Sequence, residues 1–231
     1  MNSNYDFVDK FNKLMHEISI SSQKKTSNLS IVENRKNDFD FYKTINEGKT
    51  LFIGEGNFSF SLSIAEKIAN KSNIIATCFE KEKDLSDFAI SNINKLKSFR
   101  ININFEIDAT EINQTFRGYQ FDNIIFNFPN TGSREAVEGR NSNFISLRDF
   151  LISGKKILKK NGKIIVSIID SAFYQGAFQI EEASNLAGFK KIEIYNFNPL
   201  IFKNYKHQMT NEKASAVDKN DNCITIIFSD F

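Results

Sequence analysis

The chain has 231 residues, of which 41% are hydrophobic and 25% are charged, and its formal net charge is +2. This length suits one α/β domain with a substantial core and is too short for two full domains. The near-neutral charge excludes a strongly basic surface for nucleic acid, although a local basic patch stays compatible with it.

The cysteines and histidines do not have the spacing of metal ligands. Cys78 and Cys223 each lie in an apolar run, which predicts buried thiols in a reducing compartment and no disulfide. Together with His16 and His207 they form no zinc-binding pattern, so we expect no metal site.

No stretch of the chain is long and apolar enough to predict a membrane span, which needs about 18 or more such residues. The N-terminal region carries Asp6 and Asp9, where a signal peptide requires apolar residues. We therefore expect a cytoplasmic protein that does not enter membranes.

The first part of the chain predicts an amphipathic helix and a linker. Apolar residues recur at helical spacing over 5–18, and the polar stretch 19–37 lacks any sustained period. The helix either docks on the surface of its own domain or binds a partner as a lid or docking helix. We place the domain boundary between 1–47 and 48–231.

Three aromatic residues, Phe39, Phe41 and Tyr42, stand just before the main domain. They either cover the edge of a sheet or form a wall of a ligand cleft.

The chain is organised around Thr50 to Ser61, TLFIGEGNFSFS, which predicts a strand, a glycine turn and a helix. Gly54 can adopt a positive φ, and Gly56 has no side chain to keep a ligand from the backbone. We expect amides at the start of the helix to remain unpaired and to favour an anionic or polar group. The third glycine of the dinucleotide fingerprint is missing, so a plain tight turn is the alternative.

From residue 50 onward, apolar runs alternate with helical patterns. This alternation predicts a mostly parallel sheet with helices on both faces, and the last two strands, which no crossover helix joins, predict a C-terminal antiparallel hairpin. The expected strands are 50–53, 74–79, 101–107, 121–126, 163–169, 190–197 and 222–228, and the expected helices are 59–70, 83–98, 144–159 and 176–187.

Polar residues follow the first strands at the edge where open α/β sheets bind ligands. Glu80 follows Gly56 at about the spacing of a ribose-binding acid, or it is simply an acid at a helix start. Asp108 either contacts a cofactor or caps a short helix, or does both. For Asn127 the alternative is a plain turn at the end of a strand.

Several motifs together resemble the Rossmann-like domain of the 25S ribosomal RNA uridine-N3-methyltransferase family. The similarity covers about residues 48 to 229. The motifs are LFIGEGNFSFS at 51–61, Asp108-Ala109-Thr110, FDNIIFNFP at 121–129, Arg140-Asn141, and the pair Tyr205 and His207.

The resemblance implies a methyltransferase that uses S-adenosylmethionine, with an RNA base, most plausibly in rRNA, as its acceptor. It assigns Gly54, Glu55, Gly56 and Asn57 to the methionine half of the cofactor, Glu80 to its ribose, and Asp108 with Ala109 to its adenine. It assigns Asn127 to the target nitrogen and Pro129 to the rigidity of that motif. Four further residues are expected to bind the substrate: Phe128 and, from two loops that mix cations with aromatic rings suited to phosphate contact and stacking, Arg140, Lys203 and Tyr205.

The proton on a uracil N3 has to be removed, and His207 is the candidate base because its ordinary pKa lies near neutrality. A plain surface histidine is the alternative. Phe52 stands where methyltransferases generally carry an acid, and Gln208-Met209 replaces the basic residue expected after the histidine.

Two other functions stay open. One is methylation of a small molecule or a protein, which the near-neutral charge and the missing basic residue favour. The other is a non-catalytic cofactor-binding module that serves a partner through the helix at 5–18. An intact acceptor motif at Asn127 and Pro129 argues against the second function.

Overall fold

The computed structural model describes residues 35–133, 136–207 and 222–231. The chain divides into two compact units, residues 1–35 and 36–231, and the second unit contains all the elements named below. The helix expected at 5–18 and most of the linker lie outside the described residues.

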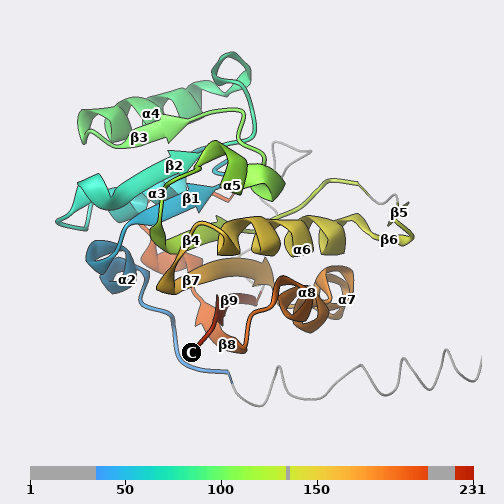
Figure 1. Cartoon of the computed structure of the whole chain (residues 1–231). Coiled ribbons are helices and arrows are strands. Elements are labelled where there is room, and N and C mark those ends of the chain that lie inside the picture. The colour runs from blue at the N-terminus through green and yellow to red at the C-terminus, as the bar shows by residue number, and fades with distance from the viewer. Residues whose placement is uncertain (1–34, 134–135, 208–221) are drawn as a thin grey trace, which may run out of the picture. The chain divides into compact units, whose positions relative to one another are not determined.

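The second unit is built on a seven-stranded sheet in the order β3-β2-β1-β4-β7-β9-β8 (Figure 1). Strands β1, β2, β3, β4 and β7 are parallel, and β9 runs antiparallel to both of its neighbours, β7 and β8. This confirms the predicted mostly parallel sheet with a C-terminal antiparallel hairpin. The strands are β1 (Thr50–Ile53), β2 (Ile74–Thr77), β3 (Asn102–Asn104), β4 (Phe121–Asn127), β7 (Leu158–Ile169), β8 (Lys191–Phe197) and β9 (Cys223–Ser229), and a separate small hairpin consists of β5 (Ala136–Val137) and β6 (Arg140–Asn141).

Helices connect the strands and supply most of the remaining core. They are α2 (Phe41–Glu47), α3 (Ser59–Ala65), α4 (Asp87–Ser98), α5 (Ile112–Thr115), α6 (Ser142–Lys155), α7 (Ala172–Phe178) and α8 (Ile180–Ala187). Short 3-10 turns occupy Lys71–Asn73, Glu82–Asp84, Ala109–Glu111 and Pro199–Ile201. The start of helix α4 is fixed by its N-cap residue: the Ser86 side chain accepts a hydrogen bond from the Ala89 amide in the first turn.

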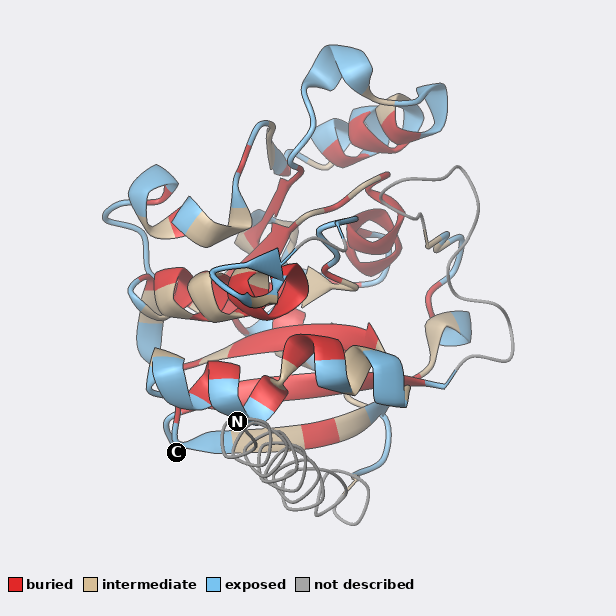
Figure 2. Cartoon of the chain, turned by 90° about the vertical axis from the view of Figure 1, so that its right-hand side faces the viewer, coloured by how far each residue is buried: buried red, intermediate tan, exposed pale blue. Residues whose placement is uncertain are grey.

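Neighbouring residues of the central strands point to opposite faces of the sheet, and each face is covered. Phe52, Ile125 and Ile165 belong to one apolar cluster together with buried residues of α2, α3 and α4. On the other face, α6 lies so close to the sheet that a Cβ at Gly154 would be 2.7 Å from Ile164 Cδ1. Figure 2 shows the strands as the most continuously buried part of the unit.

Several predicted boundaries are wrong, each for a local reason. The expected helix 59–70 ends at Ala65. The expected strand 101–107 narrows to Asn102–Asn104, and Glu106 beyond it has a φ of 57°, which no strand accommodates. The expected helix 176–187 is part of two helices, α7 and α8, because Gln179 between them adopts a left-handed φ of 44°.

Helix α2 was not expected, and it changes the role of the upstream aromatic residues. Asp40 accepts a hydrogen bond from the Lys43 amide and caps this helix. The buried Phe41 ring packs edge-on against Phe60 and Phe197 at centroid distances of 5.5 and 5.8 Å. These aromatics therefore cover the sheet.

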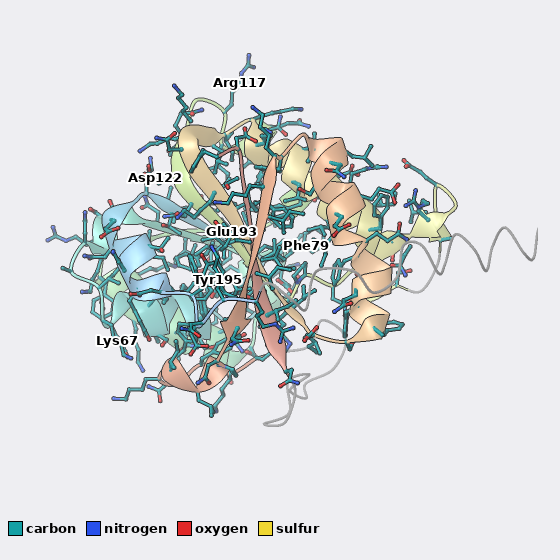
Figure 3. All side chains as sticks on the ribbon, turned by 90° about the horizontal axis from the view of Figure 1, so that it is seen from below. Lys67, Phe79, Arg117, Asp122, Glu193 and Tyr195 are labelled. Atoms are coloured by element: carbon teal, nitrogen blue, oxygen red, sulfur yellow. The ribbon has the colours of Figure 1, made fainter. Side chains whose placement is uncertain are left out.

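The compact unit begins at Lys36 and contains α2. A domain boundary between residues 47 and 48 stays a prediction. Lys36 pairs with β8 through the carboxylate of Glu193 and the hydroxyl of Tyr195, both labelled in Figure 3. No helix within 35–133, 136–207 or 222–231 is long and apolar enough to cross a membrane. Cys78 and Cys223 are both buried thiols, as expected.

Candidate active site

A cavity of about 630 Å³ opens at the carboxyl ends of β1, β2 and β4. This is the edge at which open α/β sheets bind ligands. All the residues predicted to contact the cofactor line the cavity, namely Gly54, Glu55, Gly56, Asn57, Glu80, Asp108 and Ala109. Of the predicted acceptor-side residues, Asn127, Phe128, Tyr205 and His207 line it as well.

The turn after β1 requires glycine at its first position. Gly54 has a φ of +66°, and a Cβ there would collide with the ring of Phe126, with Cδ2 and Cζ both at 3.2 Å. The next amide, that of Glu55, donates to the Thr77 carbonyl at 2.9 Å and fixes the turn to the end of β2. The turn is therefore rigid and close-packed.

The amides that begin α3 are capped by side chains of the turn. The Ser59 amide donates to Asn57 Oδ1 at 3.0 Å, and the Ser61 amide donates to Glu55 Oε2 at 3.2 Å. The expectation that these amides stay unpaired for an anion is therefore wrong for both residues. The turn offers a ligand its carboxyl group and its shape, while these two amides are already paired.

Glu55 is the most deeply buried acidic side chain of the cavity lining, with 8% of its surface exposed. Burial raises the pKa of its carboxyl from an ordinary 4.5 to about 7, although hydrogen bonds from the Ser61 amide and hydroxyl oppose this shift. The carboxyl therefore titrates close to neutrality.

The segment that carries Tyr205 and His207 is anchored directly to the glycine turn. Asn57 Nδ2 donates to the Lys206 carbonyl at 2.9 Å, and the Lys206 amide donates to Ser59 Oγ at 2.9 Å. These bonds join parts of the chain that are far apart in sequence and hold the side chains on either side of Lys206 at the cavity.

His207 packs its ring edge-on against Phe128, with 4.5 Å between the ring centroids, and its Nδ1 lies 3.4 Å from the Tyr205 hydroxyl. Burial lowers the pKa of His207 to about 4. The imidazole is therefore neutral at physiological pH, and one of its two ring nitrogens carries no proton.

Asn127 ends β4 and faces the cavity with a side chain that lacks partners. Both polar atoms of this side chain are buried, and within the described ranges of the chain Nδ2 donates no hydrogen bond and Oδ1 accepts none. The next residue, Phe128, has a left-handed φ of 53° and donates its amide to the Ser167 carbonyl at 2.7 Å. Unsatisfied buried amides are costly, and left-handed non-glycine residues concentrate at functional sites. The pair therefore points to a ligand that satisfies the Asn127 amide.

Three predicted site residues do not reach the cavity lining. Pro129 is buried behind it, and Lys203 is exposed outside it. Arg140 forms a two-pronged ion pair with Glu182, with Nη2 2.7 Å from Oε2, and its guanidinium lies 4.1 Å above the Phe144 ring. Arg140 thus joins the small hairpin to α8 and α6.

Two parts of the lining were not predicted from the sequence. Phe79, labelled in Figure 3, is 67% exposed at the cavity and directly precedes Glu80. One face of α6 lines the cavity too, and its residues have helical spacing that could have revealed it. These residues are Ser142, Ile145, Ser146 and Asp149.

The charge of the cavity is one-sided. Its described lining contains four acidic side chains, Glu55, Glu80, Asp108 and Asp149, and neither a lysine nor an arginine. Since His207 is neutral, the walls favour a ligand that is neutral or positively charged. Asp108 also caps the 3-10 turn after it, accepting from the Thr110 amide at 2.8 Å, as one of its two predicted roles required.

The profile of one protein family, BMT5-like, described as rRNA (uridine-N3-)-methyltransferase BTM5-like, matches residues 51–209. An uncharacterized protein of Arabidopsis thaliana is 36% identical over 129 residues, which is 52% of this chain and 62% of that protein. The human ferredoxin-fold anticodon-binding domain-containing protein 1 is 25% identical over 172 residues, 68% of this chain and 27% of that protein. The chain thus spans less than two thirds of the length of these relatives.

Among solved structures, SMU.776, described as a methyltransferase complexed with SAH, superposes with a TM-score of 0.50 at 16% identity, over 80% of this chain and 46% of that one. This likeness concerns the fold, which is that of Rossmann-like methyltransferases. The glycine turn, the strand-end motif around Asn127 and the His207 segment all fall within the residues that the family profile matches. The chain belongs to the BMT5-like family of methyltransferases.

Proposed function

We propose that this protein is an S-adenosylmethionine-dependent methyltransferase that modifies a ring nitrogen of an RNA base, with uridine N3 of rRNA as the preferred acceptor. The observation that carries the proposal is the unpartnered Asn127 amide beside a glycine turn in one cavity. Membership of a family described as rRNA (uridine-N3-)-methyltransferase supports it.

The residues of the cavity fit this cofactor. At neutral pH it carries an ammonium and a sulfonium against one carboxylate, and the four acidic side chains of the lining match that positive charge. When bound, the cofactor supplies a methyl group on a positively charged sulfur. The turn from Gly54 to Asn57 would hold its methionine half, Glu80 its ribose, and Asp108 with Ala109 its adenine, and SMU.776, which shares the fold, is complexed with SAH.

The acceptor would meet Asn127 and Phe128. The Asn127 side chain offers one donor and one acceptor, which match the N–H and C=O groups along the edge of a pyrimidine. Phe128 offers a ring face for stacking, and Pro129 restricts the backbone directly after these two residues. Positioning of this kind supplies much of the acceleration of a displacement reaction.

His207 would accept the proton that leaves the ring nitrogen. Its neutral imidazole keeps a lone pair at physiological pH, and Tyr205 and Phe128 hold the ring in place. Proteins that methylate RNA bases also have to receive a base taken out of its stack, and exposed Phe79 adds an aromatic surface at the cavity.

One observation favours a second candidate, methylation of a small molecule or a protein. Arg140, which was expected to bind the substrate, is already paired with Glu182, and the described part of the cavity lining offers no cation for a phosphate. A cytoplasmic location remains part of the proposal. The non-catalytic module has no comparable support, because the orphaned Asn127 amide has no use in it.

The experiment separates acceptor from cofactor by replacing Asn127. Asn127→Ala should leave the affinity for S-adenosylmethionine, measured by calorimetry, within a few fold of wild type. Turnover on rRNA should fall by roughly 10- to 100-fold, the effect of one lost hydrogen bond of about 1.5–3 kcal/mol in the transition state. The matched control is Asn161→Ala, an exposed asparagine outside the cavity lining. Equal losses of affinity and turnover would make Asn127 a structural residue and refute the assignment.

A further inference from the structure

Glu55 is a buried acid that has no positive partner. Its side chain lines the cavity with 8% of its surface exposed, and both of its hydrogen bonds, from the Ser61 amide and hydroxyl, end on Oε2. Within the described ranges no ion pair reaches this carboxyl. A buried carboxylate without a counter-charge is costly, so the neutral form is favoured until a cation arrives.

The other titratable groups that face Glu55 come from the residues just after β2 and from the segment before residue 208. Cys78 and Tyr205 both interact electrostatically with Glu55, and burial raises the pKa of each, that of Cys78 to about 12, so both are neutral. His207 is neutral because burial lowers its pKa to about 4. Glu80 is an exposed acid of the same cavity. None of these groups supplies a positive charge.

We propose that Glu55 selects cationic ligands in this cavity by releasing its proton to solvent when a ligand that carries an ammonium or sulfonium group binds beside it. The step balances in charge, because a neutral carboxyl group and a cation give a carboxylate paired with that cation and one proton in solution. The proposal rests on the proposed function, since it concerns the same cavity and the same cofactor.

The titration of Glu55 sets the pH range of the effect. The carboxyl is raised to a pKa of about 7 in the free protein, so it is mostly protonated at pH 6. A nearby cation stabilises the carboxylate and lowers this pKa. Affinity for a cationic ligand should therefore rise as pH rises toward 7, because a smaller fraction of the protein then has to release the Glu55 proton on binding. The ligand's own α-amino group keeps its charge in this range, since such groups titrate at about 7.7–8.0.

The test measures protons released on binding, by calorimetry at pH 6 in buffers of different ionisation enthalpy. Wild-type protein should release about 0.5 to 1 proton per S-adenosylmethionine bound, given a pKa within about one unit of 7. Its affinity should rise roughly tenfold between pH 5.5 and 6.5. 5′-Methylthioadenosine, which lacks both the ammonium and the sulfonium, should bind without releasing a proton.

Two variants locate the proton. Glu55→Gln keeps an oxygen that accepts from Ser61 and should bind S-adenosylmethionine without proton release. Asp149→Asn, at a lining acid that is assigned no contact with the cofactor, should release protons as wild type does. A wild-type protein that binds the cofactor with no proton release and a flat pH profile overturns the role of Glu55 and leaves the proposed function standing. Failure of wild type to bind the cofactor at all overturns both.

Discussion

Replacing Gly54 by alanine should destabilise the fold more than the same change at a left-handed glycine whose surroundings are open. The alanine must adopt a φ of +66°, which costs about 1–2 kcal/mol for a residue with a Cβ. Its Cβ also enters the space of the Phe126 ring, and overpacking of this kind costs about 1–3 kcal/mol. The sum is about 2–5 kcal/mol of unfolding free energy.

A domain of this size loses about 2–4 °C in unfolding temperature for each kcal/mol. We therefore expect Gly54→Ala to lower the midpoint, followed by far-UV circular dichroism, by roughly 4–20 °C. The control is Gly118→Ala, because Gly118 has a φ of +85° but no atom within 4 Å of its Cβ position, so that only the backbone strain remains. Adding Phe126→Leu to Gly54→Ala should recover part of the loss. Equal destabilisation by the two alanine variants, with no recovery, would refute the collision and leave only strain.

Three further results are expected. Because burial raises the pKa of the Cys78 thiol to about 12, iodoacetamide should not alkylate it at pH 8 in the folded protein, and rapid labelling without unfolding would contradict this. Arg140→Ala should lower the unfolding temperature, since it removes the ion pair with Glu182. It should leave the salt dependence of RNA methylation unchanged, whereas Lys203→Ala should flatten that dependence. A flatter salt dependence in Arg140→Ala would instead support the predicted contact of Arg140 with RNA. Glu55→Gln should match wild type in unfolding free energy near pH 4 and exceed it by about 3 kcal/mol above pH 7. The reason is that the raised pKa of Glu55 makes wild type lose stability as pH rises through 7 and the buried carboxyl ionises. Equal stability of the two proteins at pH 8 would contradict the burial of this charge.

The strands could be predicted from the sequence because their signal is local. The segments that form β1 and β4 are apolar and end at polar clusters. Because ligands bind at the carboxyl ends of parallel strands, these clusters were predicted to line one cavity. Helix α2 was missed because it has only seven residues, and its aromatic run gave no helical period. The break at Gln179 could not be foreseen, since glutamine does not mark a left-handed residue as glycine does.

The details of the site that escaped prediction depend on contacts between distant segments. Nothing local in the sequence shows that the Lys206 backbone is held by Asn57 and Ser59. The pairing of Arg140 on β6 with Glu182 on α8 is equally non-local. Such contacts decide which predicted residues face the cavity, and they can be identified only once the three-dimensional fold is known.

The most direct test of the central claim is mass spectrometry of nucleosides from rRNA incubated with the purified protein and S-adenosylmethionine. The account predicts 3-methyluridine in the RNA treated with wild-type protein and its loss with Asn127→Ala, while both proteins bind the cofactor. Cofactor binding without any methylated nucleoside in the RNA would contradict the proposed acceptor.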